Sequence, residues 1–327
     1  MHYRSFGRDS IEISEVGLGC WQMGGNWGVV EDSTAREILR TSLNNGVNIL
    51  DTADVYGDGR SETTIGNYLG GKTDDLFIAT KVGRGEGIYP NNYTPEAITL
   101  RIENSLRRLK VEALDLVQTH CIPLAAMQDG SAYECLRELQ HQGKILRFGA
   151  SVETMEEANW AIDHLPDLYS LQIIFNIFRQ KPIAELFEKA KAHHTGIVAR
   201  VPLASGLLTG KLTRNPTFGA TDHRNFNKDG AAFNVGETFA GLSFEKGVEL
   251  IEQLKDIKDT SQPMAQWALR WILDFDAIST VIPGASKVSQ SEDNAAASEL
   301  DPLPPEIHQE LSRFYEDSIK DHIRGPY

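Results

Sequence analysis

The sequence predicts an α/β protein of the (β/α)8 TIM-barrel class, with an N-terminal β-hairpin and long loops at the C-terminal face of the barrel. Short, nearly continuous apolar runs alternate with helical segments, which is typical of parallel strands covered by helices. There are eight such runs, the number that closes a barrel. With 327 residues, 41% of them hydrophobic, the chain is expected to form one domain over residues 1–327.

The hairpin and the strands are predicted from the pattern in chain order. Tyr3–Phe6 and Ile11–Ser14 flank the turn sequence Gly-Arg-Asp-Ser and predict the hairpin. The eight apolar runs predict the barrel strands, in the order Val16–Cys20, Val47–Thr52, Leu76–Val82, Ala113–Thr119, Arg147–Val152, Leu171–Phe175, Gly196–Val201 and Ala277–Ile282. The alternative is an open doubly wound sheet, but Gly17–Gln22 does not complete the Gly-rich dinucleotide turn that such a sheet carries.

Several of the helices between these runs carry end signals. The triplet Asp-Ser-Thr precedes a predicted helix over Ala35–Asn44, which Gly46 closes. Thr94, followed by Pro and Glu, opens a helix over Ala97–Leu109. Thr154 and the Glu three residues later form a capping-box pattern.

Three connecting segments are long: Gly83–Tyr93, Gly206–Phe244 and the tail Glu316–Tyr327. Long loops at the C-terminal ends of barrel strands usually cover the active site. A disordered surface insertion is the alternative for Gly206–Phe244. It is less favoured, because the segment begins within a pattern of small residues suited to phosphate.

Composition narrows the function classes. The net charge of −14 disfavours nucleic acid and anionic membrane surfaces as partners. No run of 18 apolar residues exists, and the N-terminus lacks the apolar stretch of a signal peptide. Cys20, Cys121 and Cys135 are odd in number and widely spaced, which argues against a disulfide framework and predicts a cytoplasmic protein. The sequence makes no prediction of the oligomeric state.

Polar residues recur at the C-terminal ends of three neighbouring predicted strands. Asp51 ends the second strand, Lys81 the third and His120 the fourth. Charges there are costly unless paired, and Asp51 and Lys81 can pair across adjacent strands. Tyr56 follows Asp51 by five residues, so its loop can fold the phenol over the same mouth. A nearby ammonium lowers the phenol pKa, ordinarily about 10, and a phenol acid suits carbonyl reduction. The four residues form the predicted catalytic group.

Each residue of this group also has a structural interpretation when it is taken alone. Asp51 and Lys81 could be a structural ion pair, Tyr56 a packed loop aromatic, and His120 a buried histidine with ordinary partners. Their joint occurrence at one barrel mouth is what favours catalysis.

Three motifs resemble the aldo-keto reductase superfamily, in particular its bacterial-type NADP-dependent oxidoreductases. Asp51–Gly57 resembles the signature after the second strand, Ala79–Val82 the lysine strand, and Leu114–His120 the histidine strand. The resemblance runs from Arg4 to about Asn294. It implies a catalytic tetrad of the four residues named above and a nicotinamide cofactor bound without a Rossmann fold.

The resemblance also implies a set of cofactor-binding residues and no metal. The set comprises Trp21, Ser151, Gln172, Arg200, Pro202, Leu203, Ser205, Gly206, Leu208, Gly210, Lys211, Gly284, Ser286, Lys287, Gln290, Asp293 and Asn294. Within it, Ser151 and Gln172 resemble the pair that binds the carboxamide, and Trp21 also matches an aromatic wall of the substrate pocket. The small residues between Pro202 and Lys211 let backbone N–H groups approach the pyrophosphate. The residues from Gly284 onward resemble the site for the adenosine and its 2′-phosphate.

Two positions depart from the common pattern of the superfamily. Val152 stands where many members have Asn, so one carboxamide contact is expected to be lost unless Asn176 replaces it. Arg200 stands where an aromatic residue often stacks on the nicotinamide, and a planar guanidinium can stack as well. Lys287 is the one cation near the predicted 2′-phosphate site. It favours NADP, with NAD as the alternative.

The predicted function is reduction of a small or sugar-derived aldehyde or ketone with NADPH, with the proton supplied by Tyr56. One alternative is the reverse reaction, an aldose or sugar-alcohol dehydrogenase. A second is a non-catalytic nucleotide-binding regulatory subunit. A metal-dependent hydrolase is disfavoured, because His193 and His194 lie before a strand and not at strand ends. Cys121 is predicted to pack away from the site, since neighbours on a strand point to opposite faces.

Overall fold

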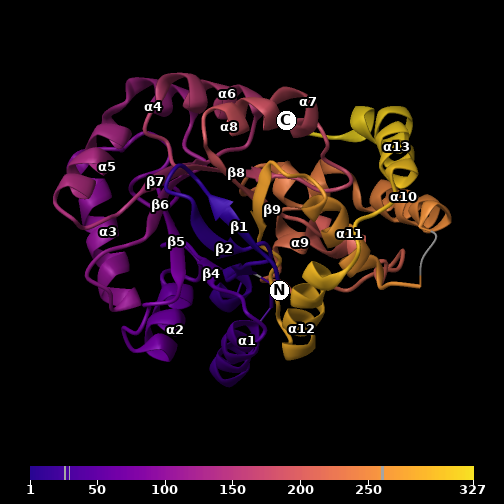
Figure 1. Ribbon diagram of the computed structural model, residues 1–327, viewed down its shortest axis with the longest axis horizontal. Helices are drawn as coiled ribbons and strands as arrows, with labels where there is room; N and C mark the ends of the chain where they lie inside the picture. Colours follow the sequence, from indigo (N-terminus) through magenta and orange to yellow (C-terminus); the bar gives the residue numbers. More distant parts are fainter. Residues whose placement is uncertain (26, 29, 259–260) are drawn as a thin grey trace.

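The structure is a computed structural model that describes residues 1–25, 27–28, 30–258 and 261–327. Eight parallel strands follow one another in chain order around a sheet, and the helices surround it (Figure 1). The strands are β3 (Leu18–Gly19), β4 (Ile49–Asp51), β5 (Phe77–Val82), β6 (Leu116–His120), β7 (Phe148–Ser151), β8 (Ser170–Ile174), β9 (Gly196–Arg200) and β10 (Ile278–Val281). Each of the eight predicted runs overlaps one of them, so the predicted (β/α)8 barrel is confirmed.

The barrel closes between its first and last strands. Parallel bridges join Val16 to Val281 and Gly19 to Gly284. The N–H of Gly17 donates to the carbonyl of Val281 at 2.8 Å. A side chain at Gly19 would place its Cβ 2.7 Å from the carbonyl oxygen of Ile282, so glycine is required for this close approach.

The helices form the outer layer. They are α1 (Asp32–Asn44), α2 (Arg60–Leu69), α3 (Pro95–Leu109), α4 (Leu124–Asp129), α5 (Ser131–His141), α6 (Met155–His164), α7 (Pro182–Glu185), α8 (Phe187–Ala192), α9 (His223–Phe226), α10 (Phe244–Ile257), α11 (Met264–Leu273), α12 (Val288–Ala296) and α13 (Pro305–Phe314). The caps predicted at Thr94 and Thr154 are both present, the second as a full capping box. Helix α1 begins at Asp32 and not at Ala35. The Asp32 carboxylate accepts from Arg60 at 2.8 Å, and the helix extends through Asp32 to an N-cap at Glu31.

The predicted hairpin is present as β1 (Tyr3–Phe6) and β2 (Ile11–Ser14), paired antiparallel. Phe6 and Ile13 are fully buried in the cluster that fills the barrel interior. The Phe6 ring packs edge-on against Phe77, with ring centroids 5.4 Å apart. The hairpin therefore covers the end of the barrel opposite the strand C-termini.

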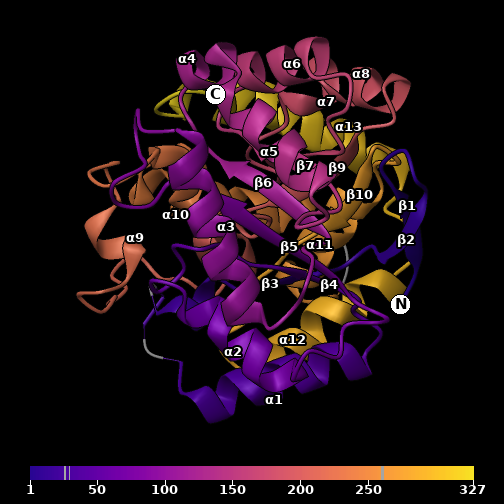
Figure 2. The same ribbon diagram turned by 90° about the vertical axis from the view of Figure 1, so that its left-hand side faces the viewer.

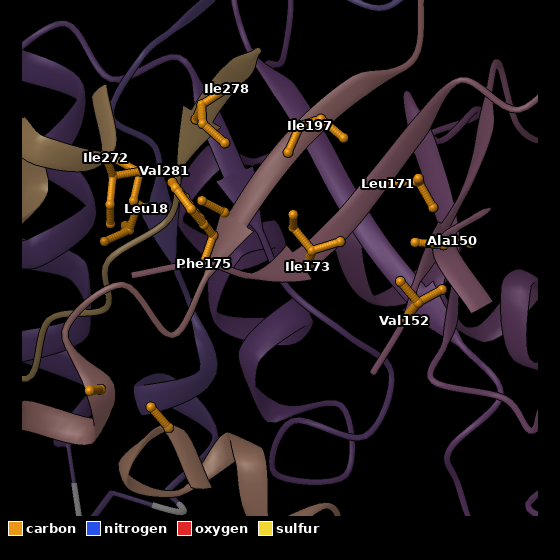
Figure 3. Close-up of a cluster of buried hydrophobic side chains, with 14 of the residues drawn as sticks. Leu18, Ala150, Val152, Leu171, Ile173, Phe175, Ile197, Ile272, Ile278 and Val281 are labelled. Carbon is orange, nitrogen blue, oxygen red and sulfur yellow. The ribbon is translucent and has the colours of Figure 1, made fainter. Parts of the chain in front are cut away.

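Side chains alternate between two apolar layers along each strand. Figure 3 shows Ala150, Leu171, Ile173 and Ile197, from the neighbouring strands β7, β8 and β9, in the cluster that packs against the helices. Because side chains on a strand alternate between faces, the residues between them point into the barrel. This alternation turns Gln172 and its counterparts on the other strands toward the interior.

The segment Gly206–Phe244 is ordered by short helical turns: η2 (Ala204–Thr209), α9, η3 (Val235–Glu237) and η4 (Phe239–Gly241). Figure 2 shows α9 projecting beyond the barrel. The tail holds this segment, since Arg324 donates from Nε to the Gly241 carbonyl at 3.0 Å. Asp222, His223, Glu237 and Thr238 are buried, so the later part of the segment packs against the fold.

Two further expectations concern cysteine chemistry and membrane segments. All three cysteines are free and buried. Among the described residues, none of the helices combines the length and apolar character needed to span a bilayer.

Candidate active site

A buried ion pair lies at the C-terminal ends of β4 and β5. Lys81 Nζ lies 2.5 Å from Asp51 Oδ1 and also donates to the Thr52 carbonyl at 2.7 Å. The two charged side chains are only 1% and 4% exposed. Burial lowers the pKa of Lys81, but Asp51 and Tyr56 outweigh it, and the net shift is upward. Lys81 therefore stays protonated in the interior.

Tyr56 lies against this pair. Lys81 Nζ donates to Tyr56 Oη at 3.3 Å, and the ammonium lies 4.9 Å from the centroid of the ring. Burial raises the pKa of Tyr56 to about 12, and Lys81 offsets only part of that rise. The ammonium thus acts in the predicted direction, but the expected net decrease is wrong because burial dominates. At neutral pH the phenol keeps its proton and can donate it.

His120, the last residue of β6, faces the same space. Its ring centroid is 5.8 Å from that of Tyr56, and the planes are nearly perpendicular at 84°. Burial, followed by Arg84, Lys81 and Arg200, holds the pKa of His120 well below its usual value. Its Nδ1 has no hydrogen-bond partner within the described part of the chain. A neutral imidazole with an unsatisfied nitrogen is suited to bind a ligand oxygen or N–H group.

One cavity brings most of the predicted residues together. Those that line it are Trp21, Asp51, Tyr56, His120, Ser151, Gln172, Arg200, Pro202, Leu203, Ser205, Gly206, Lys211, Gly284, Ser286, Gln290, Asp293 and Asn294. Lys81 lies behind Tyr56 and Asp51 and acts on the cavity through them. The cavity runs from the strand ends to the first turns of α12.

Three predicted cofactor residues are not among those that line this cavity. Leu208 is fully buried in the apolar layer under the helices. Gly210 ends the η2 turn in a left-handed conformation, with φ 67°. Lys287 is the N-cap of α12, and its N–H donates to Gln290 Oε1 at 3.1 Å. Packing keeps the Leu208 side chain away from the cavity, whereas Gly210 and Lys287 form a turn and a helix cap that are not part of its lining.

Two loops add lining residues that the sequence did not predict. Trp27, Arg224 and Glu237 line the cavity. The ring of Trp27 packs against His223 with centroids 4.3 Å apart, so two loops meet over the site. The length of the segment Gly206–Phe244 was the sequence signal for Arg224 and Glu237, but it did not say which side chains turn inward. No sequence signal pointed to Trp27.

Arg200 and Val152, the two departures from the family pattern, are in contact. Arg200 Nη2 donates to the Val152 carbonyl at 3.0 Å. Arg200 Nη1 lies 3.4 Å from a carboxylate oxygen of Glu237. Its Nε is buried without a hydrogen-bond partner among the described residues.

The amide side chains of Gln172 and Asn176 already form hydrogen bonds within the protein. Gln172 donates from Nε2 to Asp51 at 2.7 Å and to Gln118 at 3.0 Å. With both amide hydrogens used, only its carbonyl oxygen can bind a carboxamide, as an acceptor. Asn176 donates to the Val201 carbonyl and accepts from the Phe178 N–H, and it does not line the cavity. Asn176 is therefore not placed to replace the carboxamide contact that is expected to be lost at position 152.

Cys121 does not follow the alternation of side chains along a strand, on which its predicted orientation was based. It follows the last residue of β6 and has a φ of 49°, so strand alternation does not govern it. Its sulfur lies 3.6 Å from both Ser151 Oγ and Arg200 Nη2. Burial raises the pKa of the thiol, which stays protonated and packs beside the site.

The cavity has the features of a dinucleotide site. His120 and Arg200 line its strand-end part, and each has a buried nitrogen without a hydrogen-bond partner among the described residues. Lys211 adds positive charge along its wall, where phosphates would be attracted, whereas the guanidinium of Arg224 is paired with the carboxylate of Asp222 at 2.6 Å. Small and amide side chains, together with the carboxylate of Asp293, line the other end at the start of α12. The donor set thus fits a nicotinamide dinucleotide that extends from β6 and β9 to α12.

Comparisons with known proteins show which family the chain resembles. The sequence profile of the Aldo/keto reductase family matches residues 15–316. The aldo-keto reductase YhdN of Bacillus subtilis is 30% identical, with 100% of this chain and 97% of the relative covered. The solved structure of aldo-keto reductase AKR11C1 from Bacillus halodurans in its holo form gives a TM-score of 0.79 at 26% identity, covering 99% and 100% of the two chains. That of the glycerol dehydrogenase AKR11B4 from Gluconobacter oxydans gives 0.77 at 28%, covering 99% and 97%.

Proposed function

The chain belongs to the aldo/keto reductase family and is an NAD(P)-dependent oxidoreductase, and on this premise we propose that it reduces a small or sugar-derived aldehyde or ketone with NADPH. The observation that carries the proposal is the phenol of Tyr56. It is protonated, held by Lys81 at 3.3 Å, and shares a cavity with a neutral His120. A proton donor beside an uncharged imidazole suits a carbonyl oxygen that becomes an alkoxide.

Each residue of the tetrad has a distinct task in this proposal. The bound nicotinamide supplies the hydride. His120 hydrogen-bonds the carbonyl oxygen and orients it toward Tyr56. Tyr56 donates its proton to that oxygen as negative charge develops there. Lys81 stabilises the phenolate that remains, and Asp51 keeps Lys81 charged and in position.

The cofactor-binding roles follow from the lining residues. Ser151 and the carbonyl oxygen of Gln172 are assigned to the carboxamide, and the Arg200 guanidinium to the nicotinamide ring. The segment from Pro202 to Lys211 is assigned to the pyrophosphate. Residues Ser286, Gln290, Asp293 and Asn294 line the end assigned to the adenosine.

NADPH is proposed as the preferred cofactor because Lys287 adjoins Ser286 at the adenosine end. Since the Lys287 side chain does not line the cavity, its contribution requires the side chain to swing toward a bound 2′-phosphate. Steady-state reduction measured with NADPH and NADH tests the preference. Lys287→Met should bring the ratio of kcat/KM with NADPH to kcat/KM with NADH closer to one. Equal kcat/KM values for the two cofactors in the wild type would refute the proposed preference for NADPH.

The direction of the reaction is open to a second candidate. The similar structure of a glycerol dehydrogenase supports alcohol oxidation, because hydride transfer is reversible. Initial rates in both directions at neutral pH discriminate the two. A regulatory role without catalysis is less well supported, because all four tetrad residues are present and in contact distance of their partners.

The decisive experiment is a substrate panel with NADPH, covering aldoses, keto-sugars, methylglyoxal and aromatic aldehydes. We expect turnover with at least one class, measured as loss of nicotinamide absorbance. The matched control is Tyr56→Phe, which keeps the aromatic ring and removes the hydroxyl group that donates the proton. Rates no higher than those of this variant across the whole panel would reject the proposed function.

A further inference from the structure

Two arginines and two glutamates form a charged cluster beside the active site: Arg84, Arg200, Glu153 and Glu237. Arg84 Nη1 lies 2.7 Å from Glu237 Oε1, and Arg84 also pairs with Glu153. Arg200 Nη1 lies 3.4 Å from the same oxygen of Glu237. The four formal charges cancel, so the cluster is neutral as a whole.

Burying four charges is not a route to stability by itself. Replacing such a network by well-packed apolar side chains is often neutral or stabilising. The side chains of Arg200 and Glu237 are only 9% and 8% exposed. A cluster kept in so buried a place calls for a role other than holding the fold together.

Only two members of the cluster reach the cavity wall. Among the described residues, Arg200 and Glu237 line the cavity together with Tyr56 and His120, whereas Arg84 and Glu153 lie behind them. Burial raises the pKa of Glu237, but Arg84 and Arg200 outweigh it, and the net shift is downward. Glu237 is therefore an ionised carboxylate at the site.

The backbone around Glu237 is fixed by contacts that do not involve its carboxylate. Ser205 Oγ donates to the Glu237 carbonyl at 3.0 Å and accepts from the Phe239 N–H at 3.1 Å. Asn227 donates to Thr238 Oγ1 at 3.0 Å. These bonds let the charge of Glu237 be removed while the loop keeps its anchors.

We propose that Glu237 sets the charge of the nicotinamide site: its carboxylate neutralises Arg200, and this balance determines the relative affinity for oxidised and reduced cofactor. The inference rests on the proposed function, in which Arg200 lies against the nicotinamide. The oxidised ring carries a positive charge and the reduced ring carries none. An uncompensated guanidinium therefore repels the oxidised form selectively, and Glu237 removes that repulsion.

The test uses Glu237→Gln in the full chain, with Kd for NADP⁺ and for NADPH measured by fluorescence titration. The ratio of Kd for NADP⁺ to Kd for NADPH should rise roughly 15-fold, as expected for one charge acting over roughly 10 Å at an effective dielectric constant of about 20. Glu237→Asp keeps the charge and should restore most of the wild-type ratio.

Glu153→Gln is the matched control, because it removes the same charge from the same cluster behind the cavity wall. It should change the ratio less than Glu237→Gln does. If Glu237→Gln weakens both cofactor forms equally, Glu237 is only structural and the inference is overturned. If the wild type binds neither form, the proposed function and the inference fail together; wild-type binding with an unchanged ratio in the variant sinks the inference alone.

Discussion

Replacing Lys81 by Met removes the ammonium that touches Tyr56 Oη at 3.3 Å. The phenol would still be present and still protonated. The phenolate left after proton transfer would lose its counter-charge in a buried site. We therefore expect kcat for carbonyl reduction to fall steeply while NADPH still binds, because Lys81 does not line the cavity.

The size of the effect follows from the distance. Two unit charges 3.3 Å apart interact by about 5 kcal/mol at an effective dielectric constant of about 20. If about half of the charge has developed on the phenol in the transition state, the barrier rises by roughly 2.5 kcal/mol, a loss of about 70-fold in kcat. A loss between about 30-fold and 1,000-fold is the expected range.

The single variant also leaves the buried Asp51 carboxylate without its partner, which destabilises a protein by about 3–5 kcal/mol. The double variant Lys81→Met, Asp51→Asn removes both charges and separates the two effects. Its free energy of unfolding, measured in urea, should recover toward that of the wild type. Its kcat, measured in single turnovers with saturating NADPH, should stay low.

The reasoning fails if the double variant keeps kcat within about threefold of the wild type. In that case the ammonium would serve only to neutralise Asp51. Recovery of stability together with a low kcat would instead assign Lys81 to the phenolate.

Three further predictions concern the same site. Tyr56→Phe should lower carbonyl reduction by at least about 100-fold, because no general acid replaces the phenol, while Kd for NADPH changes little; retained turnover would remove Tyr56 from the acid role. Arg200→Ala should raise Kd for NADPH, and an unchanged value in fluorescence titration would reject the guanidinium contact with the nicotinamide. The depressed pKa of His120 means that the unfolded chain binds a proton which the folded chain excludes, so stability is lost as pH falls below about 6.5. Between pH 6.5 and 5.5 this linkage amounts to about 1 kcal/mol, and urea unfolding of His120→Asn should lack that component; an identical pH dependence in both proteins would contradict it.

The sequence predicted the barrel and the proximity of the four proposed tetrad residues because both depend on short-range periodicity. Eight apolar runs specified eight strands, and alternation along each strand specified which residues face inward. Asp51, Lys81 and His120 lie at the ends of three consecutive strands, so their proximity follows from strand order alone. Tyr56 follows from its five-residue distance to Asp51.

The sequence did not predict the contacts that join distant segments. Arg84 and Glu237 are 153 residues apart in the chain, and nothing in the local pattern of either residue pairs them. The side chain of Cys121 does not follow the alternation along β6, because the backbone of Cys121 is in the left-handed region directly after the strand. Trp27 and Arg224 reach the cavity through loops whose paths depend on the packing of the whole barrel.

The electrostatics of the site divide in the same way. The sequence determined that an ammonium would lie beside the phenol, and the Lys81–Tyr56 contact bears this out. Only the tertiary structure decided the net pKa of Tyr56, because burial is a sum over every element that covers the ring, and here it outweighs the ammonium. Strand order follows from the local pattern of the sequence. The depth of burial of Tyr56 and the balance of charge around it are set only when the loops pack over the barrel mouth.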